Sequence, residues 1–411
     1  MAKTLKVALV GGPMYDGLYA RLPQFEKASG IRVEIGFRGD HPSLNQHIAE
    51  HGRDYDVIST HSKYAPSQAQ LLRALDDLLS GAELASFTPS TIELMRYRGA
   101  LLQLPRLVDA KIVLYRRDLF EDESIRKYFE QTSGRALEVP KTWDALVEVA
   151  GYMHQDDEHA GFVFPGKESG LFGHFFEILE SAGGTLFDDD LKPAFESDAG
   201  RYALETLIKL YKDAAPKALV DWHYDQVAAH FQAGKAAMTT DWPGGYHGYQ
   251  NSRAIRDLFD VAIYPVGPSG KRRVYAGAHS FAITTSTTDV PAALELLRFL
   301  TSEESQIDDA RRGSVVARPK AMEAVRAETK PGSREERRLK ILEQTMRDCM
   351  AIPPKFPTYP PCEDALWGSI RSALLGRLSL DEALKGAAAA VRKAASETPH
   401  PQPVSHKGRG A

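Results

Sequence analysis

Aromatic residues on a loop are the first side chains in this sequence whose type and position could do chemistry. A segment of small residues at 236–240 runs into a Gly/Pro turn that carries Trp242 and Tyr246, with Asp241 at the junction. Soluble proteins usually bury aromatic rings on the faces of helices and strands, whereas rings on a loop at a strand end offer a surface against which something flat can pack. The turn is therefore a candidate binding surface.

A single carboxylate interrupts an otherwise apolar stretch. Asp109 follows Leu107 and Val108 and is followed by the apolar run of the segment 107–121. A carboxylate in such a setting must be paired or hydrogen-bonded, because removing it from water without a partner is costly. Arg106 could be its structural ion partner, and the sequence leaves that assignment open.

Polar residues also end one predicted strand. Residues 54–61 have the pattern of a buried strand that finishes with Thr60 and His61. Ligands of open α/β sheets sit beyond the carboxyl ends of the strands, which would place both side chains at a binding rim. The alternative is that they only cap the helix predicted at 62–79.

Nucleotide-binding patterns are incomplete. A dinucleotide fingerprint that starts at Gly12 would need glycine where Met14 stands, and Pro13 lacks the N–H that a phosphate would use. Lys167 and Ser169 lie at a predicted helix start, where an anion or a hydroxyl could bind, but the neighbouring residues lack the P-loop pattern. We expect no nucleotide cofactor.

Local catalytic signatures are also absent from the sequence. It has no Gly-x-Ser-x-Gly and no His-Glu-x-x-His motif, and its 13 histidines are scattered rather than spaced as metal ligands. We expect neither an enzyme nor a metal site. A pair of glycosidase carboxylates from distant segments would leave no local signature, so that alternative stays open.

Composition limits the class of protein. With 411 residues and 43% apolar content, the chain can bury the cores of two or three domains. Its 51 basic and 55 acidic residues show no concentrated basic run, which argues against nucleic acid as a partner. No window approaches the roughly 20 apolar residues of a membrane span, and residues 1–4 lead directly into a strand without a secretory segment. Either an export signal has been replaced by a start methionine, or the protein is cytoplasmic.

The two cysteines, Cys349 and Cys362, flank a proline-rich loop. A disulfide between them would close a short loop and contribute roughly 3 kcal/mol on the chain-entropy model. Two free thiols that pack as small apolar side chains are equally compatible with the sequence.

The elements that must position these residues alternate between strands and helices. A strand at 5–12, a helix at 18–30 and a strand at 31–37 favour a parallel α/β sheet. A later amphipathic helix is predicted to begin at Asp289, which is a suitable N-cap residue. Residues 399–411 have the composition of a disordered tail.

Several short motifs follow one another in a fixed order along the chain. They are LVDAKIVLYRRDLFE (107–121), VPKTWDAL (139–146), GFVFPGK and SAGGTLFD (within 161–188), GKAAM (234–238), Trp-Pro with an aromatic (242–246), FAIT (281–284), AALELLRFLTSEESQ (292–306) and GSVVARPKA (313–321). In this order and spacing they resemble the extracellular (periplasmic) solute-binding proteins of family 1, the carbohydrate-binding subunits of ABC importers. The resemblance covers about residues 5–395.

The resemblance implies an α/β fold of two lobes joined by a hinge, the type II periplasmic-binding-protein-like fold. Lobe 1 would comprise residues 1–109 and 260–318, and lobe 2 residues 110–259 and 319–398. It also implies that the lobes close over a ligand, because a ligand that binds the closed form better shifts the population toward it.

The function implied by the resemblance is capture of a sugar, oligosaccharide or sugar derivative in the cleft and delivery to the permease subunits of an ABC importer. We therefore expect a monomer in the periplasm or another extracytoplasmic space, without a cofactor and without nucleic acid as a partner. The alternative is a carbohydrate-active or nucleotide-dependent enzyme on a two-domain α/β fold.

A sugar has apolar C–H faces and a belt of hydroxyls, so its pocket needs aromatic plates and polar partners. By resemblance, Trp242 matches the family's aromatic site, and Asp109 matches an acidic residue that often accepts hydrogen bonds from ligand hydroxyls. The full set of predicted ligand-binding residues is Tyr15, Asp16, Thr60, His61, Asp109, Lys167, Asp241, Trp242, Tyr246, Gly277, His279, Arg318 and Tyr359.

The chain departs from the family pattern in two places. Ala278 and His279 stand where relatives often carry tryptophan or a second glycine, and the first loop, residues 11–17, is not rich in tryptophan. Histidines and lysines near the predicted cleft, including Lys63, would suit an acidic, phosphorylated or sulfonated sugar, but they would equally suit a neutral one. Binding proteins for polyamines or iron share the fold, but clustered tyrosine ligands for a metal are not evident.

Overall fold

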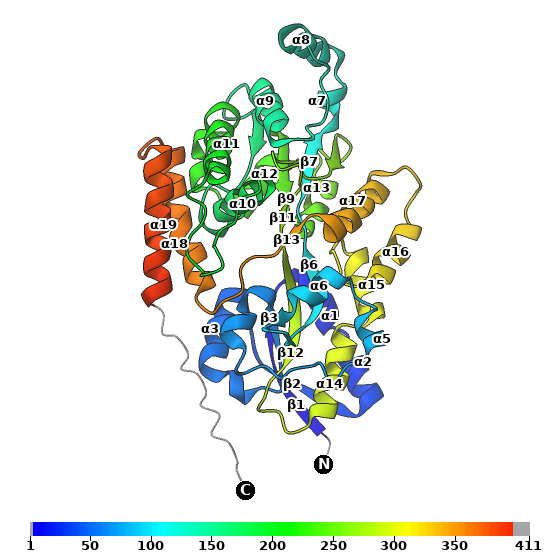
Figure 1. The fold of residues 1–411 in the computed structure, drawn as a ribbon. Helices are drawn as coiled ribbons and strands as arrows, with labels where there is room; N and C mark the ends of the chain where they lie inside the picture. The colour runs from blue at the N-terminus through cyan, green and yellow to red at the C-terminus, as the bar shows by residue number, and fades with distance from the viewer. Residues whose placement is uncertain (1–2, 398–411) are drawn as a thin grey trace.

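The computed structural model describes residues 3–397, which form two α/β units that lie end to end (Figure 1). The first unit, in the lower half of Figure 1, contains the N-terminal strands, and the second unit carries most of the middle of the chain. The segment predicted to be a disordered tail, residues 399–411, lies outside the described residues.

The first unit is built on a sheet of five strands in the order β2, β1, β3, β12 and β6. The strands β1, β2 and β3 are parallel, and β12 is antiparallel to both β3 and β6. Their bounds are Lys3–Val10 (β1), Ile31–Gly39 (β2), Val57–His61 (β3), Leu104–Asp109 (β6) and Gly277–Ile283 (β12). The parallel pair β1 and β2 confirms the α/β sheet predicted from the first strands.

The second unit has a sheet of four strands in the order β10, β7, β9 and β8. Two further pairs, β4 with β5 and β11 with β13, form small sheets of their own. The bounds are Arg96–Tyr97 (β4), Ala100–Leu101 (β5), Ile112–Arg116 (β7), Ala160–Val163 (β8), Ala236–Asp241 (β9), Phe259–Ala262 (β10), Val274–Tyr275 (β11) and Met350–Ala351 (β13).

Helices cover both sheets (Figure 1). The α-helices are α1 Pro13–Tyr19, α2 Leu22–Ser29, α3 His41–His51, α4 Ala65–Gln68, α5 Gly81–Leu84, α6 Pro89–Leu94, α7 Arg117–Glu121, α8 Glu123–Ser133, α9 Trp143–Met153, α10 Glu168–Ser181, α11 Asp198–Ala214, α12 Tyr224–Gln232, α13 Tyr246–Asn251, α14 Val290–Leu300, α15 Glu303–Arg311, α16 Pro319–Ala327, α17 Arg334–Asp348, α18 Tyr359–Leu374 and α19 Leu380–Glu397. Short 3₁₀ turns occur at η1 Gly52–Asp54, η2 Ser62–Tyr64, η3 Lys217–Asp221 and η4 Pro243–Gly245.

Local sequence signals explain several of these boundaries. Asp289 caps α14 as predicted, because its Oδ1 accepts a hydrogen bond from the backbone N–H of Ala292 at 3.1 Å. Thr142 caps α9 in the same way. Gly376, between α18 and α19, has a positive φ of 68°, a backbone conformation that glycine adopts without strain.

The predicted helix at 62–79 is wrong beyond its first turns. Only η2 and α4 form, and the chain then becomes irregular. Leu72 bridges Thr284, and the backbone N–H of Arg73 donates to the carbonyl of Ile283 at 2.9 Å. Because these backbone groups pair with the end of β12, they are not available for a continued helix. The predicted helix at 18–30 is likewise divided into α1 and α2.

The two units meet where the chain crosses between the sheets. β6 ends at Asp109 and β7 begins at Ile112, so one crossing occupies two residues, Ala110 and Lys111. A second crossing lies at Ala276, between β11 and β12. The two crossings are neighbours, because Gly277 pairs with Asp109 in the sheet register.

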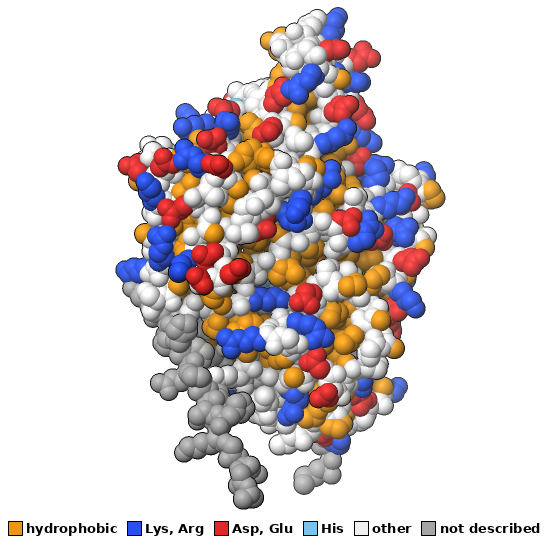
Figure 2. Space-filling model, in the orientation of Figure 1, with side chains coloured by type: hydrophobic (Ala, Val, Ile, Leu, Met, Phe, Trp, Pro, Cys, Tyr) orange, Lys and Arg blue, Asp and Glu red, His pale blue; other side chains and the backbone are white. Residues whose placement is uncertain are grey.

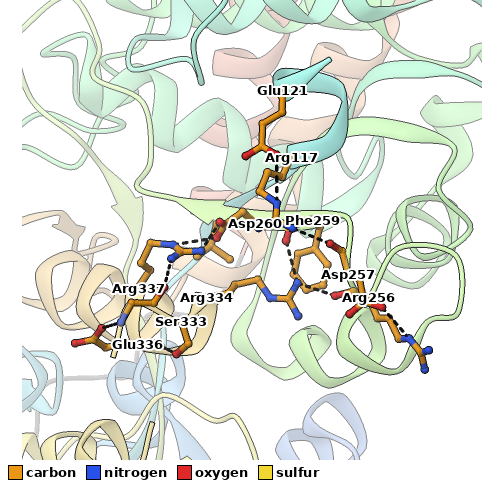
Figure 3. Close-up of polar contacts among 12 residues, drawn as sticks. Arg117, Glu121, Arg256, Asp257, Phe259, Asp260, Ser333, Arg334, Glu336 and Arg337 are labelled. Atoms are coloured by element: carbon orange, nitrogen blue, oxygen red, sulfur yellow. Dashed lines mark hydrogen bonds and ion pairs between the residues drawn. The ribbon is translucent and has the colours of Figure 1, made fainter. Parts of the chain in front are cut away.

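The predicted lobe boundary at residue 260 needs a correction. β10 pairs with β7 along its whole length, so residues 260–262 belong to the sheet of the second unit. Figure 3 shows that α17 holds this edge strand, with Arg337 paired to Asp260 and Arg334 bonded to the carbonyl of Phe259. We therefore propose that the first unit resumes after β10, and the rest of the lobe division stays a proposal.

The disulfide alternative is wrong. Cys349 and Cys362 are both free and buried. They pack as small apolar side chains, and burial raises the pKa of the Cys362 thiol to about 11.

The surface and the helices add two observations. On the face shown in Figure 2, basic and acidic side chains are interspersed, in keeping with the near balance of the two kinds in the sequence. Within residues 3–397, the search for a helix long and apolar enough to cross a lipid bilayer finds none.

Candidate functional site

A cavity of about 510 Å³ lies where the two units meet. The first unit contributes the carboxyl ends of β3 and β6 and part of β12, and the second contributes residues of α10, the start of α12 and the turn after β9. This is the position that parallel α/β sheets offer to ligands, and the volume is in the range of small-molecule sites. Four of the predicted ligand residues line it, namely His61, Asp109, Trp242 and His279.

Asp109 is the centre of the polar wall of the cavity. Its Oδ2 accepts a hydrogen bond from Nε2 of His61 at 2.8 Å, and its Oδ1 lies 3.3 Å from Nε2 of His279. The sheet register brings these residues together, because β12 pairs His279 with His61 on one side and Gly277 with Asp109 on the other. The lone carboxylate of the apolar stretch therefore has two imidazole neighbours.

Gly277 has a packing role at this wall. A Cβ atom at this position would lie 2.4 Å from Oδ2 of Asp109 and 2.9 Å from Nε2 of His61. No real Cβ atom comes that close to a polar atom, so only glycine allows the strand to pass beside the Asp109–His61 pair. This explains the small residue at the corner.

Burial and neighbouring groups shift the pKa of several side chains on this wall. Burial alone would raise the pKa of Asp109, but His279 and His61 outweigh it and hold the pKa below the usual range. Burial lowers the pKa of His61, and burial together with His279 and His61 lowers that of His41 to about 2. At neutral pH, Asp109 is therefore ionised, while His41 and His61 are neutral.

Tyr15 supports the polar wall from behind. Its hydroxyl lies 2.6 Å from Nδ1 of His279, and the guanidinium carbon of Arg106 lies 4.7 Å from the centre of its ring. Arg106 is fully buried and pairs with Asp309 through two contacts of 2.6 and 2.7 Å. The interpretation of Arg106 as the ion partner of Asp109 is therefore wrong.

Trp242 forms part of the facing wall. It follows β9 and is half-buried, with the ammonium of Lys111 5.0 Å from its ring centre. Lys111 in turn is fully buried and pairs with Glu177 at 2.7 Å. A cation against the face of an indole is attracted to it, so the Lys111–Glu177 pair helps to hold the ring at the cavity.

Three predicted ligand residues have structural partners away from the cavity. Asp16 is exposed and forms an ion pair with Arg38. Thr60 is buried and donates to Oε1 of Gln68 at 2.7 Å. Arg318 donates to the carbonyl of Thr301 at 2.7 Å, at the start of α16. In each case the side chain satisfies a local contact within the first unit.

The remaining predicted residues are not among those that line the cavity. Asp241 is buried and accepts hydrogen bonds from the N–H of Trp242 and the hydroxyl of Tyr249, and burial raises its pKa to about 6. Tyr246 lies under the guanidinium of Arg338, at 4.1 Å. The other two are Lys167, which pairs with Glu168 at 3.7 Å, and Tyr359, which is buried at the start of α18.

Most of the remaining wall was not in the predicted ligand set, although the sequence had drawn attention to Lys63 and Ser169. The lining residues outside that set include Met14, His41, Lys63, Tyr64, Ser169, His223, Tyr224, Tyr275, Ser314 and Glu363. Several stand at helix starts, where their sequence context predicts a cap or a first turn instead of a binding site. Glu363 lies inside α18, whose sequence carries no local sign that one turn faces another unit.

Metal binding has no support in the arrangement. Among residues 3–397, no group of three or more His, Cys, Asp or Glu side chains is placed to hold a metal ion. The wall instead presents the carboxyl groups of Asp109 and Glu363, the ammonium of Lys63, imidazoles and aromatic rings. This set can exchange hydrogen bonds with a polar ligand and pack against its apolar faces.

Comparison with known proteins gives a consistent result. A model of the bacterial extracellular solute-binding protein family matches residues 11–307. A probable ABC transporter-binding protein of Deinococcus radiodurans is 26% identical over 298 residues, which cover 71% of this chain and 66% of that protein. A mannitol-binding protein of Pseudomonas aeruginosa is 24% identical over 238 residues, 56% of this chain and 50% of that protein. The chain thus spans about two thirds or less of the length of these relatives.

Solved structures share the fold. Maltose-bound MalE3 of T. maritima superposes with a TM-score of 0.77 at 24% identity, covering 95% of this chain and 100% of that chain. A solute-binding protein of Agrobacterium vitis S4 with bound D-mannitol superposes with a TM-score of 0.73 at 21% identity, covering 96% of this chain and 99% of that one. These likenesses show the expected two-lobe fold.

Proposed function

Because the chain belongs to the bacterial extracellular solute-binding protein family, we propose that it captures a sugar or sugar alcohol in the cavity between its two units. The ligand would then be delivered to the membrane permease of an ABC importer. Relatives and structural neighbours described as bound to mannitol or maltose support this class of ligand.

The observation that best supports the proposal is that a polar wall of the cavity faces an aromatic one. Asp109 and its two histidines stand on the first unit, and Trp242 stands on the second. A sugar or polyol has both an apolar C–H surface for an indole ring and hydroxyls for a carboxylate. Because the walls come from different units, the ligand would contact both at once.

Hinge closure is the mechanism we propose. Two of the segments that join the units are the adjacent crossings 110–111 and Ala276, about which a small change of backbone angles could open the cavity. A ligand that touches both walls binds the closed form better than the open form and therefore shifts the population toward it. The closed form would be the one that the permease recognises.

The other parts of the proposal follow from the family. We place the protein in the periplasm or an equivalent extracytoplasmic space, as a monomer that works with permease subunits. We assign it no catalytic role, so the captured sugar should leave the cavity chemically unchanged.

Isothermal titration calorimetry of the purified protein against maltose, mannitol, ribitol, tagatose and glucose, and against spermidine and glutamate for contrast, tests this proposal. Saturable binding of one of these, with the ligand recovered intact after prolonged incubation, is the expected result. Release of a hydrolysed or oxidised product would indicate an enzyme. Binding of a polyamine or an amino acid, with no response to any carbohydrate, would contradict the assignment of the ligand class.

A further inference from the structure

Glu363 is a buried residue of the cavity wall, and one of its carboxyl oxygens accepts no hydrogen bond from the described residues. It lies on α18 and is only 5% exposed. Its Oε2 atom has no hydrogen-bond partner among the described residues, although the side chain lines the cavity. A buried carboxylate without a partner is costly, so its position at an open cavity needs an explanation.

The groups around Glu363 satisfy it only in part. The nearby hydroxyls of Tyr275 and Tyr359 favour its charged form and lower its pKa, but the Oε2 atom itself has no hydrogen-bond partner within residues 3–397. Burial raises the pKa of Glu363, and Lys63 of the first unit opposes that rise. The ammonium of Lys63 forms no hydrogen bond or ion pair with the described residues and lies 5.3 Å from the ring centre of Tyr64. The two units thus bring opposite charges to the same cavity, where Lys63 and Glu363 attract each other without a direct hydrogen bond or ion pair.

Two other glutamates of this chain, Glu177 and Glu335, are paired with cationic side chains. Glu177 accepts hydrogen bonds from Lys111 and the hydroxyl of Tyr264, each at 2.7 Å, and from the N–H of Tyr275 at 2.9 Å. Glu335 has one unpaired oxygen, but its other oxygen accepts from Arg338 at 2.9 Å. These two carboxylates, which do not line the cavity, therefore have cationic partners. In Glu363 the Oε2 atom lacks a partner in the described part of the chain, at a place where a ligand can reach it.

We propose, on the basis of the sugar-binding function proposed above, that Glu363 is a specificity-determining residue that accepts hydrogen bonds from the hydroxyls of a neutral polyhydroxy ligand. Asp109 accepts from the same ligand on the opposite wall. With carboxylates on both sides, the cavity selects neutral sugars or sugar alcohols and rejects those that carry a carboxylate, phosphate or sulfonate.

The charge balance of the wall supports this selection. Among the described residues that line the cavity, Lys63 is the one lysine and none is an arginine. Asp109 and Glu363 contribute two carboxyl groups. His41 and His61 add no positive charge, because burial lowers the pKa of each. An anionic ligand would meet two carboxyl groups beside the ammonium of Lys63 and the imidazole of His279, while a hydroxyl can donate to either carboxyl group and accept from Lys63.

The test compares matched neutral and anionic ligands by calorimetry on the full-length protein and its variants. Glucose is paired with glucuronate, and mannitol with mannitol 1-phosphate. The wild type is expected to prefer the neutral member of the pair that it binds. Glu363→Gln should lower the affinity for the neutral ligand by about tenfold. It should also reduce the ratio between the affinities for the neutral and the anionic ligand. Glu363→Asp keeps the carboxyl group but shortens the side chain. It should lower the affinity for the neutral ligand, and the anionic ligand should still bind more weakly than the neutral one.

Glu130→Gln is the matched control. Glu130 lies on α8, is exposed and does not line the cavity, so this variant should bind as the wild type does. Circular dichroism and melting curves show whether each variant is folded.

Two results would overturn the inference and leave the proposed function intact. One is unchanged binding of the neutral ligand by folded Glu363→Gln and Glu363→Asp. The other is a wild type that prefers the anionic member of a pair. A wild type that binds no carbohydrate of either kind would overturn the proposed function and this inference together.

Discussion

Nε2 of His61 lies 2.8 Å from Oδ2 of Asp109, although the two residues are 48 positions apart and end different strands. They meet because β12 lies between β3 and β6 and presents Gly277 at the contact. The pair keeps Asp109 ionised at the wall of the cavity, where a ligand hydroxyl could donate to it.

Asp109→Asn is expected to weaken ligand binding by about 1–3 kcal/mol, because an amide is a poorer acceptor than a carboxylate and His61 loses its charged partner. Calorimetry with the identified ligand gives the affinity. Asp16→Asn is the matched control, since Asp16 is exposed and pairs with Arg38 outside the cavity. Equal affinities for wild type and Asp109→Asn would show that Asp109 does not contact the ligand.

Trp242→Ala should abolish most of the stabilisation that a ligand gives, while the protein remains folded, because the ring is half-buried at the cavity. A ligand at 100 times its dissociation constant stabilises the wild type by about 2.7 kcal/mol, which a thermal-shift assay detects. Trp222→Ala is a suitable control, because Trp222 packs against His230 and does not line the cavity. If the ligand raises the melting temperature of Trp242→Ala as much as that of the wild type, the ring does not contact the ligand.

The sequence predicted part of this site for physical reasons that can be stated. Trp242 and Asp109 were predictable, because a ring on a turn and a carboxylate in an apolar stretch each break a local rule. His61 was predictable from its place at the end of a strand. Each of these signals lies within a few neighbouring residues.

Other wall residues could not be predicted, because their position depends on how distant segments pack. Glu363 faces the cavity only because α18 returns from the second unit to lie near η2 of the first. Tyr15 was predicted as a ligand contact, but the Arg106–Asp309 pair fixes it behind His279. Neither arrangement leaves a mark within one segment of the sequence.

Gly277→Ala should lower both the melting temperature and the ligand affinity, because the new Cβ would lie 2.4 Å from Oδ2 of Asp109. Overpacking of this kind typically costs about 1–3 kcal/mol. Urea denaturation and calorimetry measure the two effects. Gly368→Ala on α18 is the control, since nothing lies within 4 Å of the added Cβ there. Wild-type stability in Gly277→Ala would contradict the packing role of this glycine.

The free energy of unfolding should fall as the pH drops below about 6.5, in part because of His41. Burial first, and then His279 and His61, lower the pKa of His41 to about 2 in the folded protein, whereas the unfolded chain takes up the proton near the ordinary histidine value. The unfolded state therefore binds more protons, and one such group accounts for up to about 1.4 kcal/mol per pH unit.

His41→Gln should flatten this slope between pH 6.5 and 5 in urea denaturation. Comparing the two proteins at pH 8, where the histidine is neutral in both states, separates the loss of contacts from the proton effect. Identical slopes in the two proteins would mean that His41 takes up its proton equally well in the folded state.

The buried pair of Lys111 and Glu177 should matter most when only one partner is removed. Lys111→Met leaves the carboxylate of Glu177 without its cation in a fully buried position, and the expected loss is about 3–5 kcal/mol of unfolding free energy. The double variant Lys111→Met with Glu177→Gln should recover part of that loss, because no charge is left buried. Urea denaturation of both variants measures the difference. If the double variant is no more stable than the single one, the loss comes from packing of the lysine chain and not from the stranded charge.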